Sequence, residues 1–187
     1  IESPRRASGM RSTRGWAEDR QVYFVIEFSR PITTIDVSID GKESTAAAGS
    51  EFTGKNIKAV FGHAAGSEPL IARVGISCTG VDGASKNLAA EIPGWDFDAV
   101  AHASAQEWSK ALSVLDADLP TKALTEAFYS DAYHGLVAPA TFNDHDGAYR
   151  GQDHQNHANP GFTNYTALSI WDLSLIHISE PTRQAEI

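Results

Sequence analysis

The feature that most constrains this fold is a single change of hydrophobic periodicity, at Pro93-Gly94. Before this point, apolar residues recur at every second position, which is typical of strands. After it, they recur at intervals of three and four residues, which is typical of helices. Because the chain passes from strands to helices once, it predicts two segregated modules and not an alternating α/β sheet. We therefore expect a β + α fragment with two modules.

Four segments of the first half are predicted to be strands: 21–29, 32–40, 56–63 and 70–77. In the first two, alternation places apolar side chains on one face, namely Val22, Phe24, Ile26 and Phe28, then Ile35, Val37 and Ile39. Short strands separated by turns favour an antiparallel sandwich. Four strands are too few to close one, so we expect further strands upstream. Segment 45–54 and the arginine-rich segment 5–20 are interpreted as loops from their composition.

Two helices are predicted in the second half. The first follows Asp96, whose carboxylate is a natural N-cap, and extends to Leu115. The second starts at Pro120, whose missing N–H is harmless at a helix start, and extends to about Val137. A third helix is expected to begin near Asn164.

The polar segment 138–164 holds the candidate chemistry. It is longer than ordinary loops, and its aromatic residues favour an ordered, packed loop. The turn Asn143–Gly147 resembles a calcium loop but lacks the distal glutamate, so a turn stabilised by Asx side chains is the favoured interpretation. Four histidines in or near the segment have spacings at which a metal can be shared, but no predicted helix fixes their geometry: His134, His145, His154 and His157.

Three aspartates of this segment, Asp144, Asp146 and Asp153, are candidates for an acid/base pair. Acidic residues in glycine-rich loops are also common turn formers, and that alternative stays open. From these residues alone, the segment is a polar loop at the mouth of a helical domain. Its aromatic rings and carboxylates suit sugars, because rings stack on C–H patches and carboxylates accept from hydroxyls.

Charge and composition exclude several classes. The net charge of −9 and the pI of about 5.1 argue against a nucleic-acid partner, which requires a basic surface. The single cysteine, Cys78, allows no intrachain disulfide and no cysteine-rich zinc site. No apolar run approaches the roughly 20 residues that span a bilayer. The oligomeric state is not readable from the sequence.

Four segments, taken together, resemble glycoside hydrolase family 92. They are RSTRGWAEDRQVYFVIEFS, VGIS followed by GVDGASKNLAAEIPGWDFDAV, FYSDAYHGLVAPATFNDHDGAYRG, and NYTALSIWD. Their order and spacing also fit, and the resemblance covers nearly all of residues 5–172. It implies a β-supersandwich of the galactose-mutarotase-like type, a helical linker and an (α/α)6 catalytic barrel. In this chain we expect the C-terminal part of the sandwich at 1–92, the linker at 93–119 and the start of the barrel at 120–172.

The resemblance also implies a function for the full-length parent. Such enzymes remove terminal α-linked mannose from glycans, here with α-1,2 linkage expected, by a calcium-dependent inverting reaction. A secreted or periplasmic parent is implied, with mannose-containing glycans as partners. No catalytic residue and no calcium ligand maps onto this chain, so the fragment itself is expected to be inactive. The pair Trp171-Asp172 resembles the family's Trp-Asp-Thr segment at the terminal-sugar subsite, where Asp172 accepts hydrogen bonds from sugar hydroxyls.

Residues 173–187 are interpreted as a non-native tail. Leu173–Arg183 reads LSLIHISEPTR, which a transposase adapter used to prepare sequencing libraries encodes in one reading frame. The departure from the family begins at Leu173, where the family has Thr. Two other classes remain as alternatives: a non-catalytic carbohydrate-binding module and an unrelated β-plus-α interaction protein.

Overall fold

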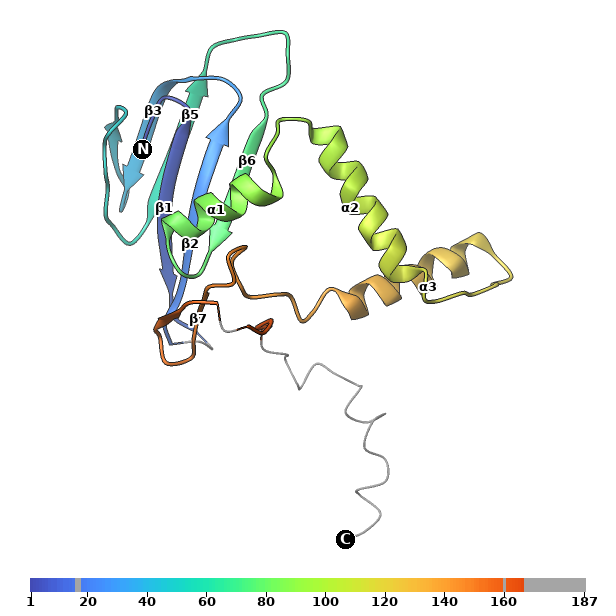
Figure 1. Cartoon of the computed structure of the whole chain (residues 1–187). Coiled ribbons are helices and arrows are strands. Elements are labelled where there is room, and N and C mark those ends of the chain that lie inside the picture. The colour runs from blue at the N-terminus through green and yellow to red at the C-terminus, as the bar shows by residue number, and fades with distance from the viewer. Residues whose placement is uncertain (16–17, 160, 167–187) are drawn as a thin grey trace. The chain divides into compact units, whose positions relative to one another are not determined.

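The computed structural model describes residues 1–15, 18–159 and 161–166 (Figure 1). The chain divides into two compact units. The N-terminal unit consists of Ile1–Glu107 together with Asn143–Phe162. The helical unit consists of Trp108–Phe142 together with the described residues from Thr163 onward. The predicted site residues Trp171 and Asp172, and the predicted tail 173–187, lie outside the described residues.

Eleven elements follow one another along the described chain, six strands first, then three helices, then two short strands. They are β1 Arg6–Thr13, β2 Arg20–Phe28, β3 Ile32–Ile39, β4 Lys42–Thr45, β5 Ile57–His63, β6 Ala72–Ser77, α1 Val81–Glu91, α2 Phe97–Leu112, α3 Lys122–Leu136, β7 Tyr149–Arg150 and β8 Asn156–His157. None of the described helices is long and apolar enough to cross a membrane.

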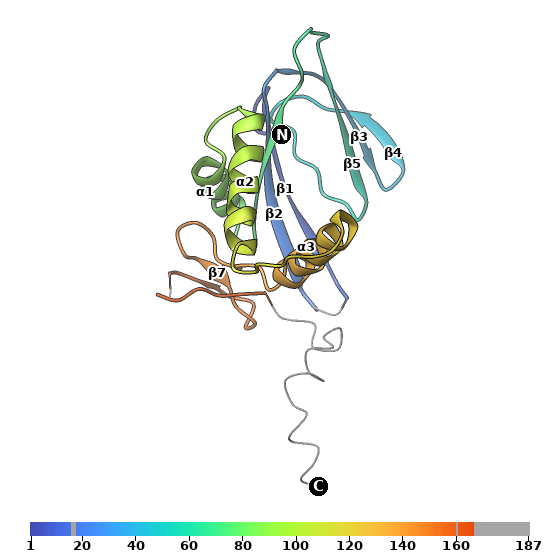
Figure 2. The ribbon, with the colours of Figure 1, turned by 90° about the vertical axis from the view of Figure 1, so that its right-hand side faces the viewer.

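The N-terminal unit contains two antiparallel three-stranded sheets, ordered β1-β2-β6 and β4-β3-β5. Phe28, at the end of β2, joins them, because its ring lies 5.4 Å from that of Phe61 and 4.9 Å from that of His63 on β5. Figure 2 shows α1 on one side of β2 and the second sheet on the other. Helix α1 covers one face of the first sheet, and on the other face the second sheet contacts Phe28 while Val74 and Ile76 of β6 stay exposed.

Helix α1 packs on the first sheet through a small apolar cluster. Val25 of β2 and Ala84 of α1 are fully buried, and Leu88 is 3% exposed. Gly75 of β6 permits this approach, since a Cβ there would lie 2.2 Å from the carbonyl oxygen of Ala84. The helix can rest directly on the backbone of β6 only because this position has no side chain.

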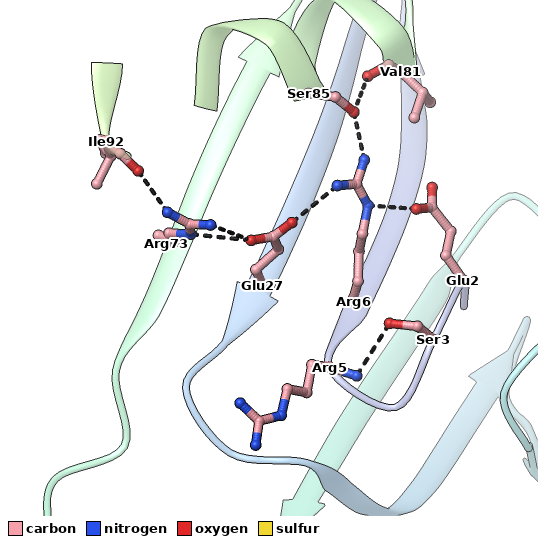
Figure 3. Close-up of polar contacts among 9 residues, drawn as sticks. All are labelled: Glu2, Ser3, Arg5, Arg6, Glu27, Arg73, Val81, Ser85 and Ile92. Atoms are coloured by element: carbon pink, nitrogen blue, oxygen red, sulfur yellow. Dashed lines mark hydrogen bonds and ion pairs between the residues drawn. The ribbon is translucent and has the colours of Figure 1, made fainter. Parts of the chain in front are cut away.

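A second, polar set of contacts also fastens α1 to the sheet (Figure 3). Glu27 of β2 accepts from Arg6 of β1 at 2.9 Å and from Arg73 of β6 at 2.7 Å. Arg6 also donates to Ser85 of α1, and Arg73 donates at 2.8 Å to the carbonyl oxygen of Ile92, just after α1. Burial raises the pKa of Glu27, but the two guanidinium groups outweigh it and hold that pKa below its usual range.

The predicted strands are confirmed, with small differences at their ends. Segments 21–29, 32–40, 56–63 and 70–77 correspond to β2, β3, β5 and β6. The face of β3 is also as predicted, because Ile35 and Val37 are buried. The sequence left open which face of β6 is covered. Val74 and Ile76 are exposed, and α1 covers the opposite face, where the glycine allows close contact.

Five elements were not predicted: β1, β4, α1 and the short strands β7 and β8 of the polar segment. The arginine-rich segment expected to be a loop contains β1, which pairs with β2 from Arg6 opposite Glu27 to Thr13 opposite Arg20. The start of the expected loop 45–54 belongs to β4. Helix α1 was missed although its buried residues Ala84, Asn87 and Leu88 follow helical spacing, because few of its residues are large and apolar and the helix is only 11 residues long.

The two later helices are where the sequence places them, with one corrected start. Asp96 accepts from the backbone N–H of Ala99 at 2.9 Å, which confirms it as the cap of α2. Helix α3 does not begin at Pro120. Thr121 is its N-cap, and its side chain accepts from the N–H of Leu124 at 3.3 Å, because a hydroxyl satisfies the free N–H groups that proline cannot.

In the helical unit, Trp108 packs edge-on against Tyr133 with ring centroids 4.4 Å apart. Neither α2 nor α3 has a buried residue, and apolar side chains such as Leu124 and Leu136 are exposed. Near Asn164, where a third helix was expected to begin, Tyr165 instead forms an antiparallel bridge with Thr141. The remainder of that predicted helix lies outside the described residues. The fold class is thus confirmed as sheets followed by helices.

Candidate functional site

The polar segment expected at the mouth of a helical domain belongs to the N-terminal unit over Asn143–Phe162. The chain passes into the helical unit after Glu107, returns at Asn143 and leaves again after Phe162. Within the returning segment, β7 and β8 form a short antiparallel pair, with Tyr149 opposite His157. In the described part of this segment the ring of Tyr149 packs against those of His157 and Phe162, in line with the packed loop that the aromatic residues predicted.

Asp144 attaches this segment to the first sheet and to α1. Its carboxylate is buried, at 7% exposure, and accepts from Ser77 at 2.8 Å, from the hydroxyl of Thr79 and from the amide of Asn87 at 2.8 Å. Asn87 in turn accepts from the backbone N–H of His145 at 2.7 Å. Three donors therefore hold this buried carboxylate in place, which favours a structural role for Asp144.

Gly83 makes room for this cluster. A Cβ at that position would lie 2.5 Å from a carboxylate oxygen of Asp144 and 2.6 Å from the hydroxyl oxygens of both Ser77 and Thr79. The first turn of α1 can approach the buried carboxylate only because residue 83 has no side chain.

Asp146 forms an ion pair with Lys86 of α1, with 2.7 Å between the charged atoms. The hydrogen bond from Lys86 holds the pKa of Asp146 below its usual range, and the same bond raises the pKa of Lys86. Asp146 also accepts from the N–H of Ala148 two residues later, at 3.1 Å. Across the turn, the side-chain amide of Asn143 donates to the carbonyl oxygen of Gly147 at 2.9 Å, so Asn143–Gly147 is a turn stabilised by an Asx side chain, as the sequence favoured.

Asp153 and His157 form a second pair, 3.0 Å apart, and the ring of His157 stacks on Tyr149 at 5.1 Å. The hydrogen bond from His157 lowers the pKa of Asp153. His154 lies 3.7 Å from Asp19. The two histidines therefore have different carboxylate partners.

No metal site emerges from these histidines and carboxylates. Among the residues that the structure describes, no group of three or more His, Cys, Asp or Glu side chains could hold a metal ion. His134 belongs to α3, in the helical unit, whereas His145, His154 and His157 belong to the N-terminal unit. The acidic and histidine side chains of the described residues therefore do not form a calcium site.

A shallow depression of about 460 Å³ lies beside the attachment point. One wall is Thr79–Gly83 with Lys86, and the other is Asp146, Ala148 and Asn156–Ala158. The amide of Asn156 donates to the carbonyl oxygen of Thr79 at 2.8 Å and joins the two walls. The segment 143–162 thus forms an open polar site against the first turns of α1.

Sequence reasoning singled out Asp144, Asp146 and Asp153 but missed their partners Ser77, Thr79, Lys86 and Asn87. In the sequence, these partners stood out only because they lie in or beside the segments that carry the family resemblance. Their spacing of about 60 residues from the loop fits no local motif. The three aspartates do not converge on one point, since each has a different partner.

Comparison with known proteins identifies the class as glycoside hydrolases. Residues 1–77 match the glycosyl hydrolase family 92 N-terminal domain, and residues 83–187 match the family's catalytic domain. The chain belongs to glycoside hydrolase family 92. The comparison with curated proteins returned no significant match.

Solved structures agree with this assignment. The chain is similar to the family GH92 alpha-mannosidase BT3965 from Bacteroides thetaiotaomicron, with 32% identity and a TM-score of 0.77 over 92% of this chain. A structure of that enzyme in complex with mannoimidazole matches equally well. The inverting mannosidase BT2199 from the same species shares the fold at 22% identity and a TM-score of 0.77. The chain spans only 24% of the length of BT3965 and of BT2199.

Proposed function

We propose that the parent protein is an exo-acting α-mannosidase that removes terminal α-linked mannose, with α-1,2 linkages preferred. The observation that carries this proposal is the match to both family 92 domains, together with the likeness to an alpha-mannosidase at 32% identity. The mannoimidazole complex of that relative supports a mannose-type substrate. The catalytic-domain match over 83–187 favours this enzyme over a stand-alone carbohydrate-binding module or an interaction protein.

The proposed reaction is inverting. In such reactions a carboxylic acid protonates the leaving oxygen, and a carboxylate about 6.5–9.5 Å away activates a water molecule on the opposite face of the sugar. In the described part of this chain, the carboxylate of Asp144 accepts hydrogen bonds from Ser77 and Asn87, and Asp146 and Asp153 are paired with Lys86 and His157. We therefore place the catalytic acid and base of the parent outside this chain.

Trp171 and Asp172 are proposed to contact the terminal mannose of the substrate. Charge-assisted hydrogen bonds from sugar hydroxyls to Asp172 would orient the ring, and the indole of Trp171 would stack on its C–H face. Calcium is proposed as the cofactor of the parent, held by residues outside this chain, and secretion or a periplasmic location is proposed for the parent. We also propose that residues 1–92 are part of a β-supersandwich and that residues 120–172 are the start of an (α/α)6 barrel.

The test compares the full-length parent with the 187-residue chain, using α-1,2-mannobiose as substrate and measuring released mannose. The parent should release mannose, with the anomer of inverted configuration detected first by NMR, and chelation of calcium should abolish the release. The chain alone should release none above a blank. A parent that is inactive on α-mannobiosides of every linkage, with calcium present, overturns the proposal.

A further inference from the structure

Residues 92–96 connect α1 to α2 and lie beside β6 of the first sheet. Arg73 of β6 is in the part of the chain that matches the family's N-terminal domain, 1–77, whereas the connection is in the part that matches the catalytic domain, 83–187. In the structure all of them belong to the N-terminal unit. We propose that Arg73 and Trp95 form a latch that locks the connection onto the first sheet and so fixes the direction in which α2 starts. The latch does not depend on the proposed reaction.

The packing of α2 does little to hold its start in place. In the described part of the chain, no residue of α2 is buried, and Phe97 in its first turn is 69% exposed. Gly94, just before the helix, has open space around it. Trp95 is better covered than Phe97, at 37% exposure. The contacts of the connection therefore decide where α2 begins.

Hydrogen bonds hold the guanidinium group of Arg73 on two sides (Figure 3). Its Nε and one of its Nη atoms donate to the same carboxylate oxygen of Glu27, at 3.0 and 2.7 Å. The other Nη donates at 2.8 Å to the carbonyl oxygen of Ile92. Such bonds lie in the plane of the group and leave its faces free, and its central carbon lies over the ring of Trp95, 4.5 Å from the centroid. A planar, delocalised cation is well suited to stack on an indole while its N–H groups bond elsewhere.

The latch is preorganised before Trp95 engages it. Ile92 is the C-cap of α1 and packs against the apolar cluster under that helix. The last turn of α1 itself has no basic residue, so Arg73 supplies the positive charge that stabilises the carbonyl end of a helix. Because Arg73 is already fixed by Glu27 and Ile92, the stack on Trp95 requires little further loss of side-chain entropy.

Loss of the stack would free the connection at one point. Ile92 would stay anchored by its carbonyl bond to Arg73 and by its packing. Pro93 has a restricted φ, whereas Gly94 has wide conformational freedom. Rotation would therefore be concentrated at Gly94, and α2 would sample several directions relative to the sheet.

The test measures the distance between the sheet and α2 in the 187-residue chain. Spin labels are attached at Asp36→Cys, an exposed position of β3, and at Ala105→Cys, an exposed position of α2, with Cys78→Ser to remove the native thiol. Double electron–electron resonance gives the distribution of distances between the labels. The chain with an intact latch should give one narrow distribution. A broad distribution in this chain overturns the proposal.

Trp95→Leu removes the stack and leaves the bonds of Arg73 to Glu27 and Ile92 in place. The broad component should increase about fivefold, which is the effect expected for the loss of one partly exposed cation–π contact. Trp95→Phe keeps an aromatic face and should restore most of the narrow component. Phe97→Leu is the matched control, because that ring is exposed, and it should leave the distribution unchanged. An unchanged distribution in Trp95→Leu, or equal broadening in Phe97→Leu, overturns the latch.

Arg73→Lys tests the other side of the contact. Lysine keeps a positive charge beside Glu27 but lacks the planar group that bonds Ile92 and stacks on Trp95 at the same time. The distribution should broaden, and adding Trp95→Leu should broaden it no further, because both side chains act through one contact. Additive broadening in the double variant contradicts the latch. If Arg73→Lys does not fold, Trp95→Leu and its Phe97→Leu control decide the question.

Discussion

The side-chain amide of Asn87 in α1 donates a 2.8 Å hydrogen bond to the buried carboxylate of Asp144, 57 residues later in the chain. This bond and those from Ser77 and Thr79 hold a segment that follows the helical unit against the sheet that precedes it.

Replacing Asp144 with alanine should detach the segment 143–162. The change leaves two hydroxyls and an amide without their acceptor in a buried place, which should cost on the order of 3 kcal/mol of unfolding free energy. Chemical denaturation and amide hydrogen exchange of residues 143–158 measure the effect. Asp118→Ala is the matched control, because Asp118 is exposed in the connection between α2 and α3. Unchanged exchange in Asp144→Ala would show that the segment is held by other contacts.

Gly83→Ala should destabilise the chain although alanine is the better helix former. The new Cβ would meet three oxygens at 2.5–2.6 Å, and overpacking of this kind costs about 1–3 kcal/mol. Gly135→Ala in α3 is the control. A Cβ there meets nothing within 4 Å, so this change should stabilise the helix by up to about 1 kcal/mol. Equal effects of the two substitutions in denaturation experiments would contradict the close approach of α1.

The unfolding free energy should depend on pH through Glu27. Its pKa in the folded chain lies below the ordinary value of about 4.3, so its contribution is fully present above that value. As the pH falls from the ordinary pKa toward the folded-state pKa, the unfolded chain binds a proton that the folded chain does not, and the contribution is lost. Denaturation midpoints measured across this range should fall less steeply in Glu27→Gln. Parallel pH profiles would show that Arg6 and Arg73 do not stabilise the charged carboxylate.

In the parent, Asp172→Ala should reduce kcat/KM for an α-mannoside and leave the melting temperature nearly unchanged. Charge-assisted hydrogen bonds contribute about 1.5–3 kcal/mol each, so the loss should be roughly tenfold to a hundredfold or more. If Asp172 instead braces neighbouring helices, the melting temperature should fall and the kinetics should stay close to those of the parent. Measuring both quantities on one variant separates the two roles.

The sequence by itself determined those elements whose signal is local. The alternation in β2 and β3 and the helical spacing of α2 and α3 are properties of short windows, and Asp96 caps α2 from within the same turn. Backbone geometry imposes these periods directly, so the amino-acid order reveals them without knowledge of the rest of the chain. The turn at Asn143–Gly147 was also predicted, because its side-chain bond from Asn143 to Gly147 lies within five consecutive residues.

Only the tertiary structure decided the roles of residues that carry no local signal in the sequence. β1 exists because its backbone pairs with β2, and α1 exists as a packed helix because Gly75 and Gly83 admit it to the sheet and to Asp144. Asp144, a candidate for catalysis from the sequence, is buried. Its hydrogen-bond donors Ser77 and Asn87 lie more than 50 residues earlier in the chain, because hydrogen bonds depend on distance in space and not along the chain. For the same reason the depression beside α1 has no counterpart in the sequence: its two walls meet only after the chain has left the N-terminal unit and returned to it.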